Sequence, residues 1–460
     1  MKKTIIVLSA LLALVACNKE NPVKESAIDP SKIVFNINVE NAEATKGVKA
    51  TWEDGDDVYV FFEDNTTKYV KMTYDGSSWT YNVLGDGDLS LAASGKKLSA
   101  VYMPDFVCSA APTYDSGNAR WTFGSVGGYY QKAEAVSYTV TSAGDVTTLS
   151  AIINLVAPSG ISQVFIPTSE YATLGFGEEY VLTATHFIQF SFEGVAPGGD
   201  VTQGNISNGF PLPSFAGTLN GETGLYFWGI LEAAGTHDFD FQLVKQNAEK
   251  KYAISSYAKS KKDATVPARF AAKLTGLTDN GNFVSLGYAG GPLWATGNID
   301  KTNSKIVDPL EAGEYFMYGN TTPYVVYRGY HMGTEDPLST SNDVAYSVNT
   351  SWRIPTNDQF YALINSSNTT NEWVTGWTNL GDIKGGRLIT SKVNGISLFF
   401  AAAGYYDNGH YESAGISGYY WSSSPGLDYS YAGRLYINSG SIGAHDAYRG
   451  WGSSVRPVQN

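Results

Sequence analysis

The chain has 460 residues, which is too many for a single hydrophobic core, so we expect two to three domains. Its net charge of −13 argues against a nucleic-acid partner, because nucleic acids bind to basic surfaces. Charged residues make up only 16% of the chain, and the 31 tyrosines and 49 glycines favour strands and turns over helices.

The first segment of the chain is typical of a secretion signal. An apolar run at residues 5–16 follows two lysines and is shorter than the roughly 20 residues of a membrane-spanning helix. The sequence Leu14-Val15-Ala16-Cys17 resembles the lipobox of bacterial lipoproteins. The resemblance implies a signal peptide at residues 1–16, lipidation of Cys17, and a tether at residues 17–30 that holds the protein at the outer membrane. The alternative is an ordinary signal peptide cut after Ala16.

Short strand patterns separated by turns follow the tether. Residues 32–39 alternate apolar and polar side chains, which predicts a half-buried strand. Gly55, flanked by acids, predicts a solvated turn before a strand at residues 58–62. Further strand patterns lie at residues 69–72, 79–83 and 98–102. This spacing is typical of a β-sandwich. Because lipidation of Cys17 leaves Cys108 without a partner, we expect no disulfide and a buried Cys108.

Three segments of this region resemble the Bacteroidales fimbrillin family. They are Thr51-Trp52-Glu53-Asp54-Gly55-Asp56-Asp57-Val58, Gly76-Ser77-Ser78-Trp79 and Ala100-Val101-Tyr102-Met103-Pro104. The resemblance covers about residues 31–280. It implies two tandem transthyretin-like β-sandwiches, at residues 31–180 and 181–280, which assemble with other pilus subunits by strand addition.

A third domain at residues 284–460 follows a polar linker. Its one predicted helix begins after Thr356, which forms a capping box with Gln359, and buries Phe360, Leu363 and Ile364 on one face. The remainder of this domain is rich in turns and strand patterns, so we expect an α+β fold.

This third domain resembles the Fibrobacter succinogenes major paralogous domain, a C-type-lectin-like fold. The matching segments occur in the family's order: Leu293-Trp294-Ala295-Thr296-Gly297-Asn298, Glu311-Ala312-Gly313-Glu314-Tyr315-Phe316-Met317-Tyr318-Gly319, Ser351-Trp352-Arg353-Ile354-Pro355-Thr356, Tyr420-Trp421-Ser422-Ser423-Ser424 and Ser454-Val455-Arg456-Pro457-Val458. We expect the motif residues Trp294, Trp352 and Trp421 to form the core. We expect Arg456 to be a buried or half-buried partner of a carboxylate.

The loops between these motifs are the candidate binding site. They combine aromatic rings, which can stack on the C–H face of a sugar, with acids, amides and imidazoles that can bind its hydroxyls. The candidate residues are Trp373, Trp377, Tyr405, Tyr406, Asp407, Asn408, His410, Tyr411, Asp428, Tyr429, His445 and Asp446. The alternative is a set of ordinary solvated loops rich in tyrosine.

Metal and catalytic motifs are not found in the sequence. The Glu-Pro-Asn, Gln-Pro-Asp and Trp-Asn-Asp tripeptides of calcium-dependent lectins are missing, and the five histidines form no His-Glu-x-x-His pattern. We therefore expect no metal, no cofactor and no enzymatic activity. A hydrolase built on two carboxylates stays open as an alternative.

These observations predict a surface-anchored adhesin, a fimbrial tip or accessory subunit that presents a lectin-like domain. Its partner would be a glycan or a protein of a host or bacterial surface. The alternative is a glycan- or protein-binding outer-membrane lipoprotein that does not polymerise.

Overall fold

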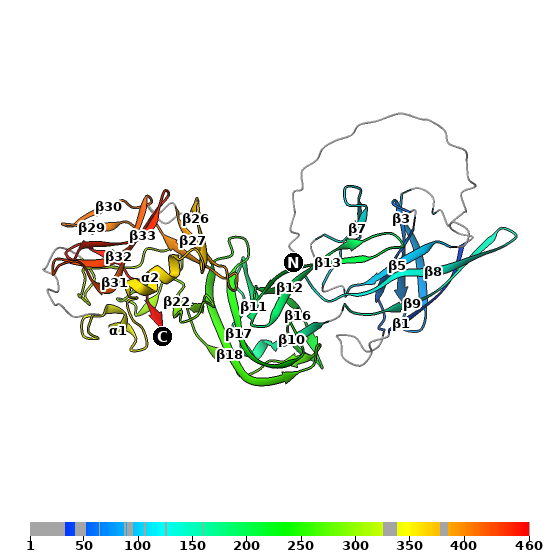
Figure 1. Cartoon of the computed structure of the whole chain (residues 1–460), viewed down its shortest axis with the longest axis horizontal. Helices are drawn as coiled ribbons and strands as arrows, with labels where there is room; N and C mark the ends of the chain where they lie inside the picture. The colour runs from blue at the N-terminus through cyan, green and yellow to red at the C-terminus, as the bar shows by residue number, and fades with distance from the viewer. Residues whose placement is uncertain are drawn as a thin grey trace, which may run out of the picture.

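The structure is a computed structural model and describes residues 33–41, 52–63, 65–86, 89, 95–104, 107–124, 127–158, 160–324, 338–377 and 385–459. Three β-rich blocks follow one another along the long axis of the molecule (Figure 1). The predicted mostly-β fold class is confirmed. The predicted signal peptide, Cys17 and the tether lie outside the described residues.

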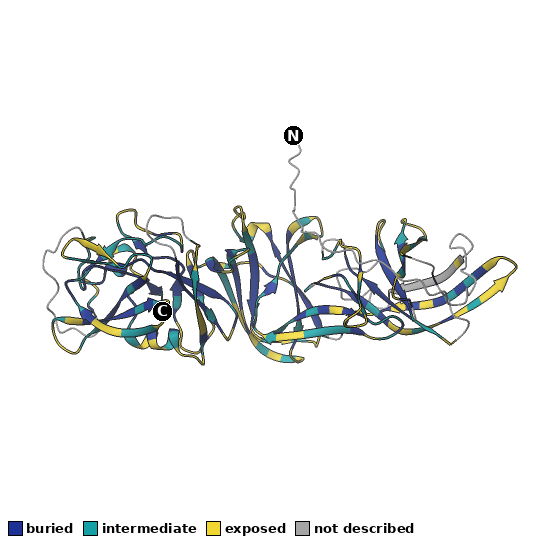
Figure 2. Cartoon of the chain, turned by 90° about the horizontal axis from the view of Figure 1, so that it is seen from above, coloured by how far each residue is buried: buried dark blue, intermediate teal, exposed yellow. Residues whose placement is uncertain are grey.

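The first block is a seven-stranded sheet with β1 at one edge, where it runs parallel to β9. In spatial order its strands are β1 (Ile33–Asn41), β9 (Val146–Leu155), β8 (Gln131–Ala143), β5 (Lys97–Tyr102), β2 (Asp57–Phe62), β3 (Lys68–Tyr74) and β4 (Trp79–Gly85). The β8–β9 hairpin projects from the block, and its tip is exposed (Figure 2).

The second block packs two sheets face to face. The first of these sheets has the order β19 (Ala271–Lys273), β10 (Ile161–Pro167), β16 (Glu222–Leu231), β12 (Phe187–Val195), β7 (Arg120–Thr122) and β6 (Thr113–Asp115), with β13 (Val201–Asn208) on β12 and β15 (Phe215–Leu219) on β16. The other has the order β14 (Leu212–Pro213), β11 (Glu178–Ala184), β17 (Gly235–Asn247), β18 (Ala253–Val266) and β20 (Thr278–Asp279). A short 3-10 turn, η2 (Thr168–Glu170), follows β10. Since β10 pairs with β16, this block includes a strand from before residue 180.

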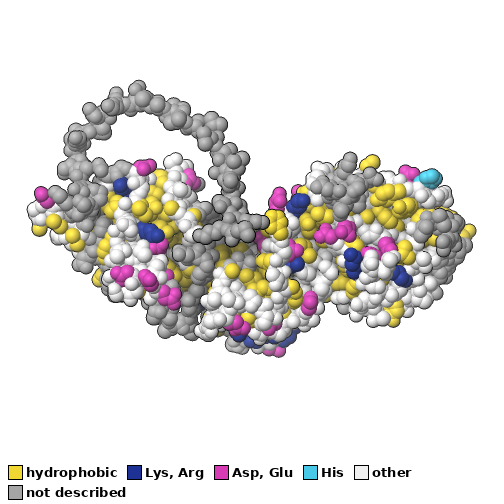
Figure 3. All heavy atoms as spheres, turned by 180° about the vertical axis from the view of Figure 1, so that it is seen from behind, with side chains coloured by type: hydrophobic (Ala, Val, Ile, Leu, Met, Phe, Trp, Pro, Cys, Tyr) yellow, Lys and Arg dark blue, Asp and Glu magenta, His cyan; other side chains and the backbone are white. Residues whose placement is uncertain are grey.

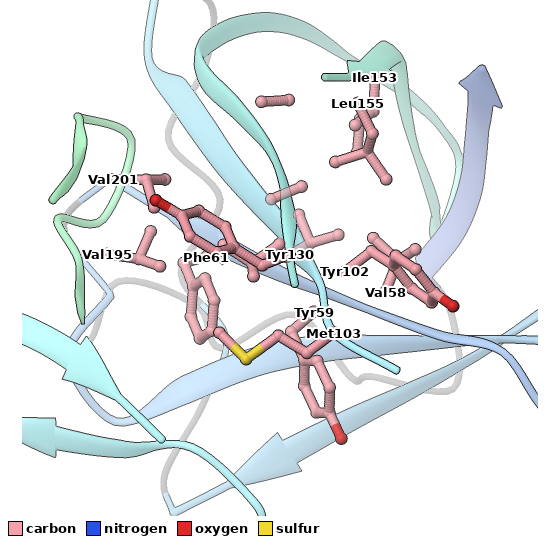
Figure 4. Packing of buried hydrophobic residues seen from close by; sticks show 14 of the residues in the cluster. Val58, Tyr59, Phe61, Tyr102, Met103, Tyr130, Ile153, Leu155, Val195 and Val201 are labelled. Atoms are coloured by element: carbon pink, nitrogen blue, oxygen red, sulfur yellow. The ribbon is translucent and has the colours of Figure 1, made fainter. Parts of the chain in front are cut away.

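The first two blocks share a core because side chains alternate across the strands. In β16, Tyr226 and Trp228 belong to the core of the first block, whereas Leu225 and Phe227 face the five-stranded sheet. Val195 and Val201 of the second block also lie among the side chains of the first sheet (Figure 4). The two blocks are therefore joined by apolar packing.

The predicted solvated turn at Gly55 is confirmed for Glu53, Asp54 and Gly55, which are exposed, and is wrong for the two acids that follow. Gly55 adopts a φ of +92°, which favours glycine. Asp56 and Asp57, however, are buried. Asp56 accepts hydrogen bonds from the Glu53 amide and the Tyr102 hydroxyl, and Asp57 pairs with Lys71 at 2.5 Å. The carboxylates can be buried because each has a partner. Cys108 is half-buried at the edge of the same core.

The third block contains several small sheets and two helices. Its strands form the sheets β21 (Phe283–Ser285), β22 (Leu293–Ala295), β35 (Val458–Gln459); β23 (Ile299–Asp300), β24 (Lys305–Ile306); β25 (Tyr315–Phe316), β34 (Ser453–Ser454), β31 (Ser417–Pro425), β32 (Tyr431–Asn438), β33 (Ile442–Tyr448); β26 (Thr369–Thr375), β27 (Gly385–Ser391), β28 (Ser397–Ala401); and β29 (Tyr405–Asp407), β30 (His410–Glu412). The helices are α1 (Val344–Val348) and α2 (Asn357–Ile364).

The predicted helix is confirmed as α2, including its cap. The Thr356 side chain accepts a hydrogen bond from the backbone amide of Gln359, and the Gln359 side chain accepts one from the backbone amide of Thr356. Phe360 and Leu363 are fully buried against the sheet that contains β31–β33. The helix therefore covers one face of that sheet and leaves the other face for different contacts.

The motif tryptophans lie in the core, as predicted. Trp294 and Trp421 are buried, and each indole donates a hydrogen bond, to the Tyr288 hydroxyl and to the Phe316 carbonyl respectively. Trp352 is half-buried against the same core. No helix among the described residues is long and apolar enough to cross a membrane.

The prediction for Arg456 is right about burial and wrong about its partner. The guanidinium is fully buried, but it donates to the Asn298 side chain at 2.9 Å and to the carbonyls of Ala295, Thr296 and Phe399. Three backbone carbonyls and the Asn298 side chain thus replace the expected carboxylate, and together they accept from all three guanidinium nitrogens.

Candidate functional site

The β29–β30 hairpin is the most regular of the predicted binding loops. Its turn is Asn408-Gly409, and both residues have positive φ angles, +48° and +84°. This is the signature of a two-residue type I′ turn, which matches the twist of the flanking strands. The turn fixes the register, so that Tyr405 pairs with Glu412 and Tyr406 with Tyr411.

The hairpin docks onto the domain through Gly452. The amide and carbonyl of Tyr406 exchange hydrogen bonds with those of Gly452, at 2.8 and 2.9 Å. A Cβ atom at position 452 would lie 2.9 Å from the Tyr324 ring and 3.1 Å from the Cβ of Tyr406. Only glycine therefore leaves room for the hairpin to approach this closely.

Tyr406 and Tyr411 lie on one side of the hairpin and build an aromatic contact with the domain. The Tyr406 ring stacks on Tyr411 and also meets Tyr315 and Tyr324, with ring centroids 5.1 to 5.4 Å apart. The hydroxyl of Tyr411 donates to the Ala403 carbonyl. These two predicted site residues thus support the hairpin.

Tyr405 points to the opposite side, onto a second group of rings. Its ring centroid lies 4.9 Å from that of Tyr419 and 5.2 Å from that of Trp451. All three side chains are half-buried, so each keeps part of its surface in contact with solvent. We refer to Tyr405, Tyr419, Tyr436 and Trp451 as the aromatic platform.

The platform lies on the sheet face opposite α2. Tyr419 pairs with Tyr436 across β31 and β32, and Arg434 pairs with His445 across β32 and β33. Paired residues point to the same face of a sheet, so these four side chains share one surface. The Tyr436 ring lies 5.2 Å from Tyr419 and 5.9 Å from the exposed His445.

Arg434 lies beneath the platform and was not predicted. It is only 8% exposed, and its guanidinium carbon lies 4.2 Å from the Tyr419 ring centroid, 4.9 Å from Trp451 and 5.7 Å from Tyr405. Its Nε and Nη1 atoms are shut off from solvent and have no hydrogen-bond partner. Burial lowers the pKa of Arg434 to about 10, so the group stays charged at neutral pH.

Two predicted tryptophans lie away from the platform. Trp377 packs against Phe399 and against Tyr252 of the second block, with Lys250 Nζ 5.8 Å from its ring centroid. It therefore contributes to the contact between the second and third blocks. Trp373 lies on β26, opposite Arg387 and 6.0 Å from its guanidinium carbon.

The remaining predicted residues are on exposed turns. Asp428 and Asp446 accept the amides of Ser430 and Leu427, at 2.7 and 2.8 Å, and so shape the turn between β31 and β32. Tyr429 is 59% exposed on the same turn. Asp407 is half-buried, and Asn408 and His410 are exposed at the hairpin tip. The structure brings only Tyr405 and His445 of the predicted set to the platform.

A weak signal for the missed residues was present in the sequence. Tyr419, Arg434, Tyr436 and Trp451 lie in the part of the third domain that is rich in turns and strand patterns, outside the loops chosen as the candidate site. The period-two spacing of Tyr419 with Trp421, and of Arg434 with Tyr436, places each pair on one strand face. It does not indicate which faces meet in space.

A concave region lies far from the platform in sequence. It is an open hollow of about 470 Å³ next to β6, β7 and β12. Two of its charged groups already have partners, because Arg120 pairs with Asp200 at 3.1 Å and Asp115 accepts hydrogen bonds from Gly117 and Asn118. Among the described residues, no group of three or more His, Cys, Asp or Glu side chains is arranged to hold a metal ion.

Seen from behind, the third block carries groups of hydrophobic side chains on its surface, close to a histidine and to scattered acidic side chains (Figure 3).

Comparisons with known proteins give distant structural similarities. No protein-family model and no curated protein matches the sequence. A solved fimbrial protein from Bacteroides ovatus is 11% identical, covers 94% of this chain and 99% of its own, and has a TM-score of 0.22. A candidate cell adhesion protein from Bacteroides fragilis is 11% identical over 56% of this chain and 92% of its own, with a TM-score of 0.28. The fimbrial anchor protein Mfa2 from Porphyromonas gingivalis is 13% identical over 49% and 80%, with a TM-score of 0.18.

Proposed function

We propose that this chain is a surface-anchored adhesin whose third block binds a glycan on another surface. The chain would be the tip subunit of a fimbria or an accessory subunit. Lipidated Cys17 would hold it at the outer membrane during export. We propose no enzymatic activity and no cofactor for it.

One observation carries this proposal: the half-exposed aromatic platform lies at the end of the molecule opposite the first sheet. Figure 1 places β29–β33 at one end, with β1 and β8 at the other. An adhesin needs this separation, because its binding surface must reach beyond its attachment point. Tyrosine and tryptophan rings suit a sugar, since they offer apolar faces together with polar groups at the rim.

The edge position of β1 supports a role in assembly. Among the described strands, β1 pairs with β9 alone, so its loss would open an edge of the seven-stranded sheet. Lys46 and Lys49 follow β1, in a segment outside the described residues, and cleavage there would separate β1 from the rest of the chain. A strand from a neighbouring subunit could then pair with β9.

The last described strand supports a terminal position in a fibre. β35 pairs with β22 inside the third block, and Val458 is fully buried. This strand is therefore engaged within its own domain. Such a subunit could accept a strand from a neighbour without donating β35.

Cell fractionation with N-terminal sequencing tests the assembly part of the proposal. We expect the protein in purified fimbriae, beginning after Lys46 or Lys49. Protein in fimbrial fractions that still carries an acylated, uncut Cys17 would contradict the tip model.

The lipobox favours a second candidate function, a permanently anchored binding lipoprotein that does not polymerise. It would use the same platform, with the first two blocks as a spacer. A monomeric, acylated protein found only in outer-membrane fractions would favour this candidate.

A glycan array tests the binding part for both candidates. We expect the chain to retain at least one class of glycan and the Tyr419→Ala variant to lose it, because Tyr419 contributes a half-exposed ring to the platform. If the folded chain retains no glycan, the glycan-binding function is wrong and a protein receptor replaces it.

A further inference from the structure

We propose that Arg434 binds an anionic group, a carboxylate or a sulfate, on the sugar that docks at the aromatic platform. This inference rests on the proposed glycan-binding function and names the class of ligand for the same site. It makes Arg434 the residue that distinguishes an acidic sugar from a neutral one.

Arg434 lacks the hydrogen-bond acceptors that the other buried arginines have. Among the described residues, four arginines are buried: Arg387, Arg434, Arg449 and Arg456. Arg387 donates to Asn438 and Ser439, Arg449 donates to Tyr431, and Arg456 has its four acceptors. Of these four, only Arg434 has buried N–H groups that no acceptor meets.

The surroundings of the Arg434 guanidinium favour an oxyanion as its partner. A buried cation is costly unless hydrogen bonds or opposite charges compensate for the lost water. The rings of Tyr419, Trp451 and Tyr405 supply cation–π attraction. Aromatic rings leave the N–H groups without acceptors, however. An oxyanion has several acceptor oxygens and matches the planar donor fork of arginine, so it would complete this environment.

A ligand can reach the N–H groups of Arg434 past the ring of Tyr405. Of the three rings around Arg434, that of Tyr405 is the most distant, at 5.7 Å. Tyr405 belongs to a two-stranded hairpin whose turn and second strand are exposed. A ligand that turns the Tyr405 ring aside would meet the guanidinium directly and keep Tyr419 as a stacking partner.

The half-exposed rings favour a sugar over an acidic peptide as the carrier of the anion. Tyr419 and Tyr436 are half-exposed, and their ring centroids lie 5.2 Å apart. Either ring offers an apolar face on which the C–H face of a pyranose can stack. The chain as a whole carries a net charge of −13, which repels acidic ligands at long range. Binding of an acidic sugar should therefore depend strongly on this one local cation.

An array of matched oligosaccharides tests the assignment with the full chain. Uronate- and sialate-terminated sugars are printed next to their carboxyl-reduced counterparts, and sulfated sugars next to their desulfated counterparts. The variants are Arg434→Met and Arg434→Lys. The matched control is Arg353→Met, because Arg353 also stacks on a tyrosine, Tyr346 at 4.4 Å, but lies outside the platform. Thermal unfolding establishes that each variant is folded.

We expect the chain to bind acidic sugars at least about tenfold more tightly than their neutral counterparts, as the loss of a charge-assisted hydrogen bond implies. Arg434→Met should remove this preference, Arg434→Lys should restore only part of it, and Arg353→Met should leave it unchanged. The carboxylate and sulfate pairs show which oxyanion is preferred.

Three outcomes would overturn the inference. Equal binding of acidic and neutral sugars, or unchanged acidic-sugar binding by folded Arg434→Met, would refute the role of Arg434 while the glycan-binding function stands. Binding of acidic peptides with no sugar bound would refute the sugar assignment and the glycan-binding function together.

Discussion

Two regions of the third block bury an arginine against aromatic rings, and they differ in one respect. Around Arg456 the guanidinium lies 4.5 Å from the Phe400 ring centroid and donates to four acceptors. Around Arg434 the guanidinium carbon lies 4.2 Å from the Tyr419 ring centroid, but its buried Nε and Nη1 atoms meet no acceptor. Burial lowers the pKa of both groups to about 10. The hydrogen bonds alone separate the two environments.

This difference distinguishes a residue that holds the fold from one that is available to a ligand. Arg456 connects β22, β28 and the C-terminal segment, which are far apart in the chain. Arg434 connects no segments by hydrogen bonds. A buried cation that forms no hydrogen bonds within the fold lowers the stability of the protein. Such a residue is retained where function requires it.

The largest effect is expected for Arg456→Met. The substitution leaves the carbonyls of Ala295, Thr296 and Phe399 and the Asn298 side chain without a donor in a buried position. We expect the free energy of unfolding of the third block to fall by at least about 3 kcal/mol. Denaturant unfolding followed by tryptophan fluorescence measures this change, with Arg353→Met as the control. A loss similar to that of the control would show that Arg456 is not structural.

A smaller loss is expected for Asp343→Ala, which removes another fully paired buried group. Asp343 caps α1 by accepting the amides of Ala345 and Tyr346, and it also accepts the Ile354 amide at 3.0 Å. Loss of a cap and of a buried acceptor should cost about 2 kcal/mol. Asn at this position keeps one acceptor oxygen, so Asp343→Asn should lose less than Asp343→Ala. Equal losses would contradict this account.

Asp343 also predicts a pH dependence with a definite sign. Burial raises the pKa of this carboxyl above its ordinary value of 3.8, although three amides oppose the change. Between 3.8 and the raised pKa, the folded chain therefore binds more protons than the unfolded chain. The free energy of unfolding should fall as pH rises through this window. Asp343→Asn should remove this slope, and a slope that persists in the variant would assign it to other groups.

An intermediate effect is expected for Gly452→Ala. The added Cβ would contact Tyr324 and Tyr406 and push the hairpin away from the domain. We expect a loss of about 1 to 2 kcal/mol and weaker glycan binding, because Tyr405 moves with the hairpin. Gly440→Ala is the control, since the nearest atom to its added Cβ is 3.7 Å away. Equal behaviour of the two variants would show that the hairpin does not depend on this approach.

The smallest effect on stability is expected for Arg434→Met. Its cation–π contacts are lost, but the cost of burying an unpaired guanidinium is lost with them. The free energy of unfolding should change by less than about 1 kcal/mol. Chemical denaturation next to Arg456→Met makes the comparison direct. A loss as large as that of Arg456→Met would show that Arg434 stabilises the fold.

Local features of the sequence predicted local structure well. The capping box at Thr356 and Gln359 defined the start of α2, because its partners lie within one helical turn. Burial of Trp294 and Trp421 followed from their size and strand context.

Contacts between distant segments could not be predicted in the same way. Three of the four acceptors of Arg456 are backbone carbonyls at residues 295, 296 and 399, and no sequence pattern specifies which carbonyls point toward this side chain. The docking of Tyr405 over Arg434 depends on the pairing of Tyr406 with Gly452. Trp377 was predicted to contribute to the binding site, but its ring packs on Tyr252 of the second block. The candidate site was therefore only partly located from the sequence.

The most direct test of the comparison is to follow the side-chain Nε–H signals of the arginines by NMR during a titration. Arginine is isotopically labelled in the full chain, and an acidic oligosaccharide selected on the array is added until binding saturates. We predict that the Arg434 Nε–H signal shifts as its site fills, whereas the Arg456 signal stays in place. Saturated binding without a change at Arg434 would contradict the assignment of the ligand site to this residue.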